Sequence, residues 1–129
     1  QYIKLSDNFI YELSRKLCME IIGLTERVSI RHGDKSFKVR AKIDTGSKYN
    51  SINDKLAKKL GLELHKKSIN IRAATGYQKR ETAFAVLTIK RRKIRTLFTI
   101  TNREHMKYQV LIGTRTLKRR FLIDPSKKK

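Results

Sequence analysis

Side chains of alternating character run through residues 37–43 and stop at an Asp-Thr-Gly sequence. In "FKVRAKI" the apolar residues occupy one face of an extended chain and the basic residues occupy the other. This period of two predicts a strand with one buried face. Because Asp44, Thr45 and Gly46 follow directly, the strand is expected to end at a sharp polar bend.

Short strand patterns separated by turns make up most of the remaining chain. "ERVSI" precedes "FKVRAKI" across the turn "RHGDK", and "SINIRAAT" and "RETAFAVLTI" flank "GYQK", with Gly76 at the tip of the hairpin. "IRTLFTI" follows the basic turn "KRRK", and "YQVLIG" and "RFLID" are further strand candidates. Helices are expected at "NDKLAKKLGL", between Asn53 and Gly61, and for one turn at "TRTLKRR". The pattern predicts a mostly β domain with a few short helices.

The first 23 residues follow a different pattern. Apolar residues at helical spacing follow Ser6 and Asp7, either of which can cap a helix, and Gly23 is expected to end that helix after Ile22. The net charge of this part of the chain also differs from that of the rest, because residues 1–30 contain four basic and four acidic side chains, while the whole chain has a formal net charge of +21. We therefore divide the chain into an N-terminal helical extension, residues 1–23, and a β domain, residues 24–129.

Net charge narrows the choice of partners. The 129 residues have a formal net charge of +21, and the whole excess lies beyond residue 30. Such a surface attracts anions, for example an acidic peptide, RNA or a ribosome, although it can also serve solubility alone. No apolar run approaches the ~18 residues of a membrane span, and no secretory signal is visible. A membrane is therefore not expected as a partner, and the expected location is cytoplasmic.

Metals, cofactors and disulfides are not expected. Cys18 is the single cysteine, which excludes an internal disulfide and suits a reducing compartment. The three histidines are widely scattered and form no metal-binding motif. A phosphate-binding Gly-Lys loop is also missing from the sequence, so no nucleotide cofactor is expected.

The Asp-Thr-Gly sequence has a structural and a catalytic interpretation. It is ordinary turn material, because Asp and Ser side chains bond nearby amides and Gly accepts positive φ. It occurs by chance in about 2% of chains of this length. Three features of its context favour catalysis: its position at the end of a strand, the later hairpin with a glycine at its tip, and the sequence "VLIG", Val110 to Gly113, before a helical turn.

Together these three features resemble the retropepsin-like aspartic proteases. The blocks "IGLTERVSI", "VRAKIDTGSKYNSI" and "YQVLIGTRTLKRRFLIDPSK" more narrowly resemble a bacterial and archaeal family named ATP-dependent zinc proteases, over about residues 21–127. Ser47, Gln109 and Thr114 stand where that family commonly has Ala, Pro and Arg. The resemblance implies a closed retropepsin-like barrel and peptidase activity, while the zinc and ATP of the family name have no matching motif here.

Roles for individual residues follow from the resemblance. Asp44 would be the catalytic carboxylate, Thr45 would brace the turn across a two-fold axis, and Gly46 would allow close backbone approach. Ile112 and Gly113 would support the turn from behind. Aspartic proteolysis needs two carboxylates about 3 Å apart that share one proton. Because one Asp-Thr-Gly and a single lobe cannot supply both, a homodimer is implied.

The hairpin after the motif is expected to cover a substrate. The candidate substrate-binding residues lie in the motif and the hairpin: Ser47, Arg72, Ala74, Thr75, Gly76 and Tyr77. Ser47 could also donate a hydrogen bond to the Asp44 carboxylate. Alternatively, the hairpin residues form only a solvent-exposed edge and do not contact a substrate. Basic residues near both segments favour acidic peptides, and the family resemblance suggests glutamate-rich tails.

Two other functions remain open at this point. A basic RNA- or ribosome-associated binding module on the same scaffold would use the cations of residues 90–93 and 119–120 to contact phosphates. Against it, aromatic residues are only 8% and Trp is absent, so a base-stacking platform is not expected. An inactive dimerisation domain would keep Asp-Thr-Gly merely as a turn. Asp124 is the main rival carboxylate, but before Pro125 it is expected to cap a turn.

Overall fold

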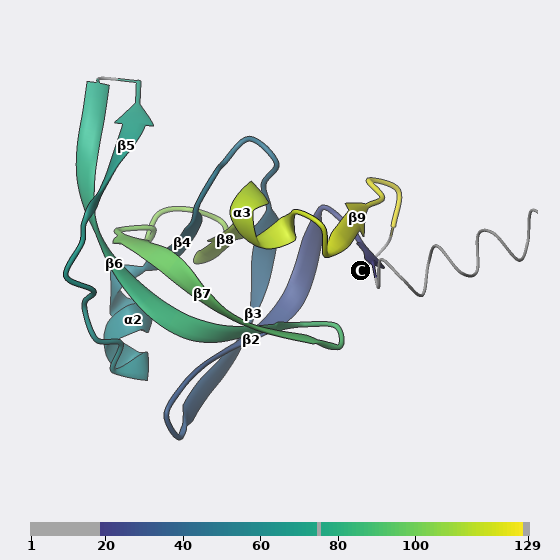
Figure 1. The fold of residues 1–129 in the computed structure, drawn as a ribbon, viewed down its shortest axis with the longest axis horizontal. Coiled ribbons are helices and arrows are strands. Elements are labelled where there is room, and N and C mark those ends of the chain that lie inside the picture. Colours follow the sequence, from purple (N-terminus) through teal and green to yellow (C-terminus); the bar gives the residue numbers. More distant parts are fainter. Residues whose placement is uncertain (1–18, 75, 128–129) are drawn as a thin grey trace, which may run out of the picture.

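The computed structural model describes residues 19–74 and 76–127, which form a β-rich body with one hairpin projecting from it (Figure 1). The elements follow in the order β1 (Glu20–Ile22), β2 (Thr25–His32), β3 (Lys35–Ile43), β4 (Asn50–Asn53), α2 (Asp54–Leu60), β5 (Ile69–Ala73), β6 (Gly76–Ile89), β7 (Arg92–Thr101), β8 (Val110–Ile112), α3 (Thr114–Leu117) and β9 (Phe121–Ile123). The helix predicted from Ser6 onward lies in its first part outside the described residues.

Six strands close into a barrel. They pair in the order β2-β3-β8-β4-β7-β6, and the ring closes where β6 pairs antiparallel with β2, for example Ile30 with Leu87. β5 pairs only with β6 and forms the projecting hairpin. Closure pairs part of every barrel strand on both sides, while residues 35–40 of β3 pair with β2 alone. The predicted mostly β closed barrel with short helices is thereby confirmed.

Alternating side chains fill the barrel. Along β6 the buried residues Ala85, Leu87 and Ile89 recur with a period of two, and Val86 and Thr88 between them are less buried. Phe98 of β7 is fully buried in the same core. Each large apolar side chain that is removed from water in this way contributes about 1.5–3 kcal/mol to stability.

Most turns and both short helices lie where the sequence predicts them. Gly33 has a φ of 62° in the turn between β2 and β3, a conformation that favours glycine. α2 begins after Asn53 and ends at Gly61, whose φ is 68°. α3 is the single turn expected in "TRTLKRR". These signals are local, so the sequence alone was sufficient to find them.

β4 was not predicted. Its four residues are all buried, and Asn50, Ser51 and Asn53 are polar, so the segment has no apolar alternation. β4 lies parallel to β7 and antiparallel to β8. The side chains of Asn50 and Asn53 are tolerated there because other parts of the fold supply hydrogen-bond partners, whereas the buried hydroxyl of Ser51 has no partner among the described residues.

The tip of the hairpin lies earlier than predicted. "GYQK" belongs to β6 and pairs with β5, with Tyr77 opposite Arg72 and Gly76 opposite Ala73. The turn therefore begins at Ala74, before Gly76, and not within "GYQK". Gly76 still supplies the positive φ, at 120°, that the turn requires.

The predicted helix was also wrong at its C-terminal end. Glu20–Ile22 is a strand, β1, which pairs in parallel with β9 in a two-stranded sheet outside the barrel. The extended chain allows Ile22 to be fully buried in the core. The apolar residues at helical spacing before Ile22 favoured a helix, and the pairing of β1 with β9 depends on a distant segment that local spacing does not reveal. The division into an extension and a β domain stays a prediction, because residues 1–18 lie outside the described part.

Candidate active site

Asp44 stands at the point where β3 leaves the barrel. β3 runs parallel to β8, with Ile43 opposite Ile112. The backbone N–H of Asp44 donates to the carbonyl oxygen of Ile112 at 2.9 Å, and the N–H of Ser47 donates to the carbonyl of Asp44 at 3.2 Å. These bonds fix the start and the first turn of residues 44–49, which we call the Asp44 loop.

One side-chain oxygen of Asp44 is held by the loop itself. The backbone N–H of Gly46 donates to Asp44 Oδ1 at 2.9 Å. A Cβ atom at residue 46 would lie 3.2 Å from that oxygen, so glycine allows the tight approach. Asp44 is half-buried and Thr45 and Gly46 are exposed. A carboxylate oriented in this way and still open to water can take part in proton transfer.

Gly113 supports the Asp44 loop from behind. A Cβ atom on Gly113 would lie 2.5 Å from the carbonyl oxygen of Tyr49 and 2.8 Å from that of Ser47, so only glycine fits. Directly after it, the N–H of Thr114 donates to the Ser47 carbonyl at 2.8 Å and the N–H of Arg115 donates to the Lys48 carbonyl at 3.1 Å. The start of α3 is therefore packed against the loop.

Asn50 joins these segments through a buried side chain that sequence reasoning missed. It is 2% exposed, its Oδ1 accepts from the Gly113 N–H at 2.9 Å, and its Nδ2 donates to Thr116 Oγ1 at 2.8 Å. The same Nδ2 donates to the Leu97 carbonyl of β7 at 3.1 Å. The one signal in the sequence was the position of this Asn, two residues before the apolar Ile52 and shortly after the Asp-Thr-Gly sequence.

Ser47 does not bond to the carboxylate. Its hydroxyl donates to the carbonyl oxygen of Tyr49 at 2.9 Å, which corrects the expectation of a hydrogen bond to Asp44. The loop curls back so that this carbonyl is the acceptor available to the side chain. In this structure Ser47 therefore stabilises the loop rather than the charge of Asp44.

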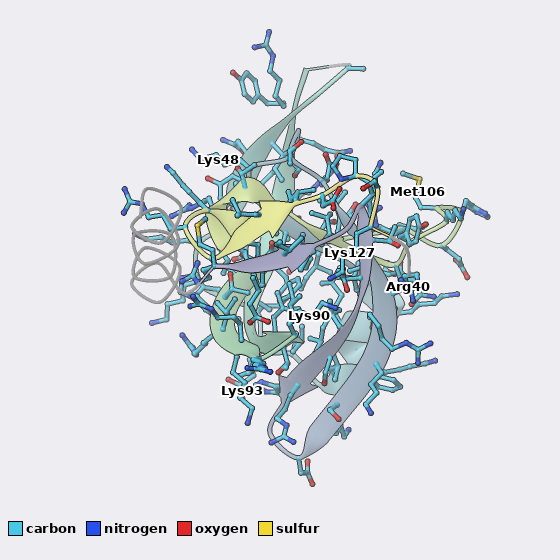
Figure 2. The ribbon with its side chains drawn as sticks, turned by 90° about the vertical axis from the view of Figure 1, so that its right-hand side faces the viewer. Arg40, Lys48, Lys90, Lys93, Met106 and Lys127 are labelled. Atoms are coloured by element: carbon cyan, nitrogen blue, oxygen red, sulfur yellow. The ribbon has the colours of Figure 1, made fainter. Side chains whose placement is uncertain are left out.

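The hairpin candidates lie on exposed strands above the barrel. Arg72, Ala74 and Gly76 are exposed, and Tyr77 is 76% exposed; Thr75 lies outside the described residues. Among the described hydrogen bonds and ion pairs, none joins this group to Asp44. Both figures show the hairpin at the upper end of the molecule, and Figure 2 shows Lys48 of the Asp44 loop in the upper half.

Arg103 is a second residue that sequence reasoning missed. Its backbone N–H donates to Asn53 Oδ1 at 2.7 Å and its Nε donates to the Tyr108 carbonyl at 2.9 Å. Burial lowers the pKa of the Arg103 guanidinium, the charge of Arg80 lowers it further, and the charge of Asp44 acts in the opposite direction. Arg103 is thus within electrostatic range of both the hairpin and the Asp44 loop. One Arg in a chain with 32 basic residues gave no signal in the sequence.

Asp124, the other carboxylate considered for catalysis, has a structural role, as expected. The N–H and hydroxyl of Ser126 donate to Asp124 Oδ1 at 2.9 and 2.7 Å, and these bonds hold the pKa of Asp124 below its usual value.

Across residues 19–74 and 76–127, no group of three His, Cys, Asp or Glu side chains could hold a metal ion. The helices of the same residues are all too short to cross a membrane.

Solved structures share this architecture at low sequence identity. A protein of unknown function from Legionella pneumophila superposes with a TM-score of 0.57 at 18% identity, covering 84% of this chain and 95% of its own. The protease of EIAV, in complex with an inhibitor, has a TM-score of 0.58 at 16% identity, with 73% and 84% covered. The simian foamy virus protease has a TM-score of 0.52 at 14% identity, with 70% and 88% covered. Among curated proteins, none matches the chain by sequence.

The closed barrel and these structural neighbours confirm the predicted retropepsin-like fold. The chain belongs to the family described as "gag-polyprotein putative aspartyl protease", whose model matches residues 29–119, well over half of its length. That range includes the Asp44 loop, the hairpin and Gly113. The family and the fold together suggest peptidase activity, and the narrower resemblance to the ATP-dependent zinc protease family stays a prediction.

Proposed function

We propose that this protein is an aspartic endopeptidase that works as a homodimer, with Asp44 of each subunit in the catalytic pair. The observation that carries the proposal is the arrangement of the Asp44 carboxylate, which accepts from the Gly46 amide on a loop anchored to Ile112 and Gly113. In the pair, one carboxylate would take a proton from the attacking water and the other would donate to the carbonyl of the scissile bond.

A dimer is required by this mechanism, because each chain has one such loop. Two carboxylates that approach to about 3 Å share a proton, since like charges at that distance cannot both ionise. Thr45 is exposed beside Asp44 and is available to a partner loop. The two-stranded sheet of β1 and β9 exposes Ile21 and Leu122, at 54% and 53%, and these apolar side chains are candidates for the dimer interface.

Acidic peptides are the proposed substrates. Lys42 and Lys48 flank Asp44 and are exposed, and Arg72 and Lys79 are exposed on the hairpin. Arg103 adds a buried positive charge within electrostatic range of Asp44 and of Arg80 on the hairpin. A cleft lined by one sign of charge concentrates ligands of the opposite sign. Glutamate-rich tails, the substrate class that the family resemblance suggests, have the required charge.

The second candidate, a nucleic-acid-binding module, is supported by the hairpin of β2 and β3. The exposed cations near its turn form no ion pair within the described part of the chain: Arg31, Lys35 and Lys38. Figure 2 shows this hairpin extending downward, away from the Asp44 end. Lys90 of the basic turn is less suited to phosphates, since it pairs with Glu26 at 3.4 Å. Such contacts would make RNA affinity fall steeply with salt.

A peptide-cleavage assay of wild type beside Asp44→Asn and Asp124→Asn tests the peptidase proposal. Both substitutions remove one carboxylate and change shape little. Loss of turnover in Asp44→Asn alone supports the proposal, and equal turnover in all three proteins contradicts it.

A further inference from the structure

A pocket lies between α3 and the strands β6 and β7. This pocket has a volume of about 270 Å³, and its lining includes residues of all three elements together with Tyr49 and Asn50. Asp44, Thr45 and Gly46 do not line it. A hydrogen bond between the hydroxyls of Thr96 and Thr116, which are 3.0 Å apart, joins β7 to α3 beside the pocket. We call it the α3 pocket.

Three arginines line the α3 pocket without an acidic neighbour. Arg95, Arg115 and Arg120 are in the lining, which contains no Asp or Glu. Within the described residues, none of the three takes part in an ion pair. Three guanidinium groups around one hollow repel one another, and an anion between them would relieve that repulsion.

Aromatic rings orient two of these guanidinium groups. The Cζ of Arg95 lies 4.3 Å from the centre of the Phe84 ring, and that of Arg115 lies 5.4 Å from the centre of the Tyr49 ring. Stacking on a ring fixes the plane of a guanidinium and leaves its N–H edges available. Arg120 uses one N–H, from Nη1 to the Thr116 carbonyl at 3.1 Å, out of the five that an arginine has.

Hydroxyl groups in the lining leave one further donor. Both hydroxyls lie near Asn50 Nδ2, at 3.2 Å for Thr96 Oγ1 and 2.8 Å for Thr116 Oγ1, and an amide NH2 group can only donate. A single hydrogen bond joins the two hydroxyls. Each hydroxyl has one hydrogen. One of the two therefore has no acceptor among the described hydrogen bonds, and a ligand oxygen can fill that position.

We propose that the α3 pocket binds a small organic molecule that carries a phosphate group. Three guanidiniums and a hydroxyl offer more donors than the two oxygens of a carboxylate can accept, whereas a phosphate dianion has three terminal oxygens and two negative charges. The apolar side chains of Ile94 and Leu97 complete the lining. The volume is close to the lower limit of small-molecule pockets, about 300 Å³, which leaves room for an organic part beside the phosphate.

Isothermal titration calorimetry with phenyl phosphate, inorganic phosphate and phenylacetate at one ionic strength tests the proposal. Phenyl phosphate is expected to bind with one site per chain and more tightly than the other two. Arg115→Gln should weaken phenyl phosphate binding at least about tenfold, because a charge-assisted hydrogen bond is lost. Arg115 and Arg95 are exposed, so either can be replaced without disturbing the core.

The matched control is Lys38→Gln, which removes one positive charge from the β2–β3 hairpin, away from the pocket. It should leave phenyl phosphate binding unchanged, and so should Asp44→Asn, since the proposal does not depend on peptidase activity. Equal weakening by Lys38→Gln and Arg115→Gln would mean that the net charge of the chain attracts phosphate nonspecifically, and would overturn the proposal. Inorganic phosphate or phenylacetate binding as tightly as phenyl phosphate, or no saturable binding at all, would also overturn it.

Discussion

The backbone N–H of Gly113 donates to the side-chain oxygen of Asn50 at 2.9 Å, across 63 positions of the sequence. This bond joins the residue that supports the Asp44 loop to the strand that follows the loop. Both residues are buried. The geometry around Asp44 therefore depends on a polar contact in the interior as well as on apolar packing.

Asn50→Ala should destabilise the fold. The substitution leaves the buried Gly113 N–H without its acceptor and the Thr116 hydroxyl without its donor, and each unpaired buried group costs about 1–3 kcal/mol. Urea unfolding followed by circular dichroism measures the change. Asn70→Ala, on the exposed face of β5, is the control and should change the free energy of unfolding little. Equal stability of the two variants would contradict a structural role for Asn50.

Asp44→Asn should reduce kcat/KM by at least about a thousandfold, because an amide cannot act as the acid or base in proton transfer. The change is nearly isosteric, so the thermal unfolding midpoint should stay close to that of wild type. Cleavage of a panel of acidic and neutral peptides provides the rate. Asp124→Asn, which alters only a turn near the C-terminus, should retain activity.

Gly113→Ala should disturb the Asp44 loop by crowding. The added Cβ would lie 2.5 Å from the Tyr49 carbonyl oxygen, and overpacking of this kind costs about 1–3 kcal/mol. Activity per folded molecule should fall with stability. Gly33→Ala is the comparison, since its Cβ would meet nothing within 4 Å and only the positive φ is unfavourable. That variant should lose some stability but no specific activity; a matching loss of activity would argue against loop crowding.

Dimer formation should depend on the apolar surface of β1 and β9. Leu122→Asp introduces a charge into the proposed interface and should shift the protein toward monomer in sedimentation velocity, with activity lost in parallel. Leu64→Asp alters a side chain of similar exposure, 59% against 53%, on another part of the surface and should leave the dimer intact. Full specific activity in a monomeric species would refute the shared catalytic pair.

Acidic peptides should be cleaved more efficiently than neutral peptides of matched length, and the advantage should shrink as salt is added. Exposed charges are screened over about 8 Å at physiological ionic strength. Arg72→Gln should reduce the preference, because Arg72 is an exposed cation of the hairpin. The measurement is kcat/KM for both peptides at low and high salt. Equal efficiency at every salt concentration would assign the basic surface to a different partner.

Local patterns in the sequence were sufficient for a large part of the fold. Alternation predicted β3, glycines marked the turn at Gly33 and the end of α2 at Gly61, and the Asp-Thr-Gly sequence predicted a polar bend at Asp44. These features depend on the conformational preferences of a few neighbouring residues, which any stretch of sequence displays directly.

Only the tertiary structure decided the pairing of β1 with β9, the strand β4 with its buried polar residues, and the electrostatic link from Arg103 to Asp44. The helical periodicity before Ile22 and the polar composition of Asn50–Asn53 pointed away from strands. A buried amide or guanidinium is stable only where distant segments supply its partners. Asn50 finds them in β7, Gly113 and α3, so its position could be known only once the barrel had closed around it.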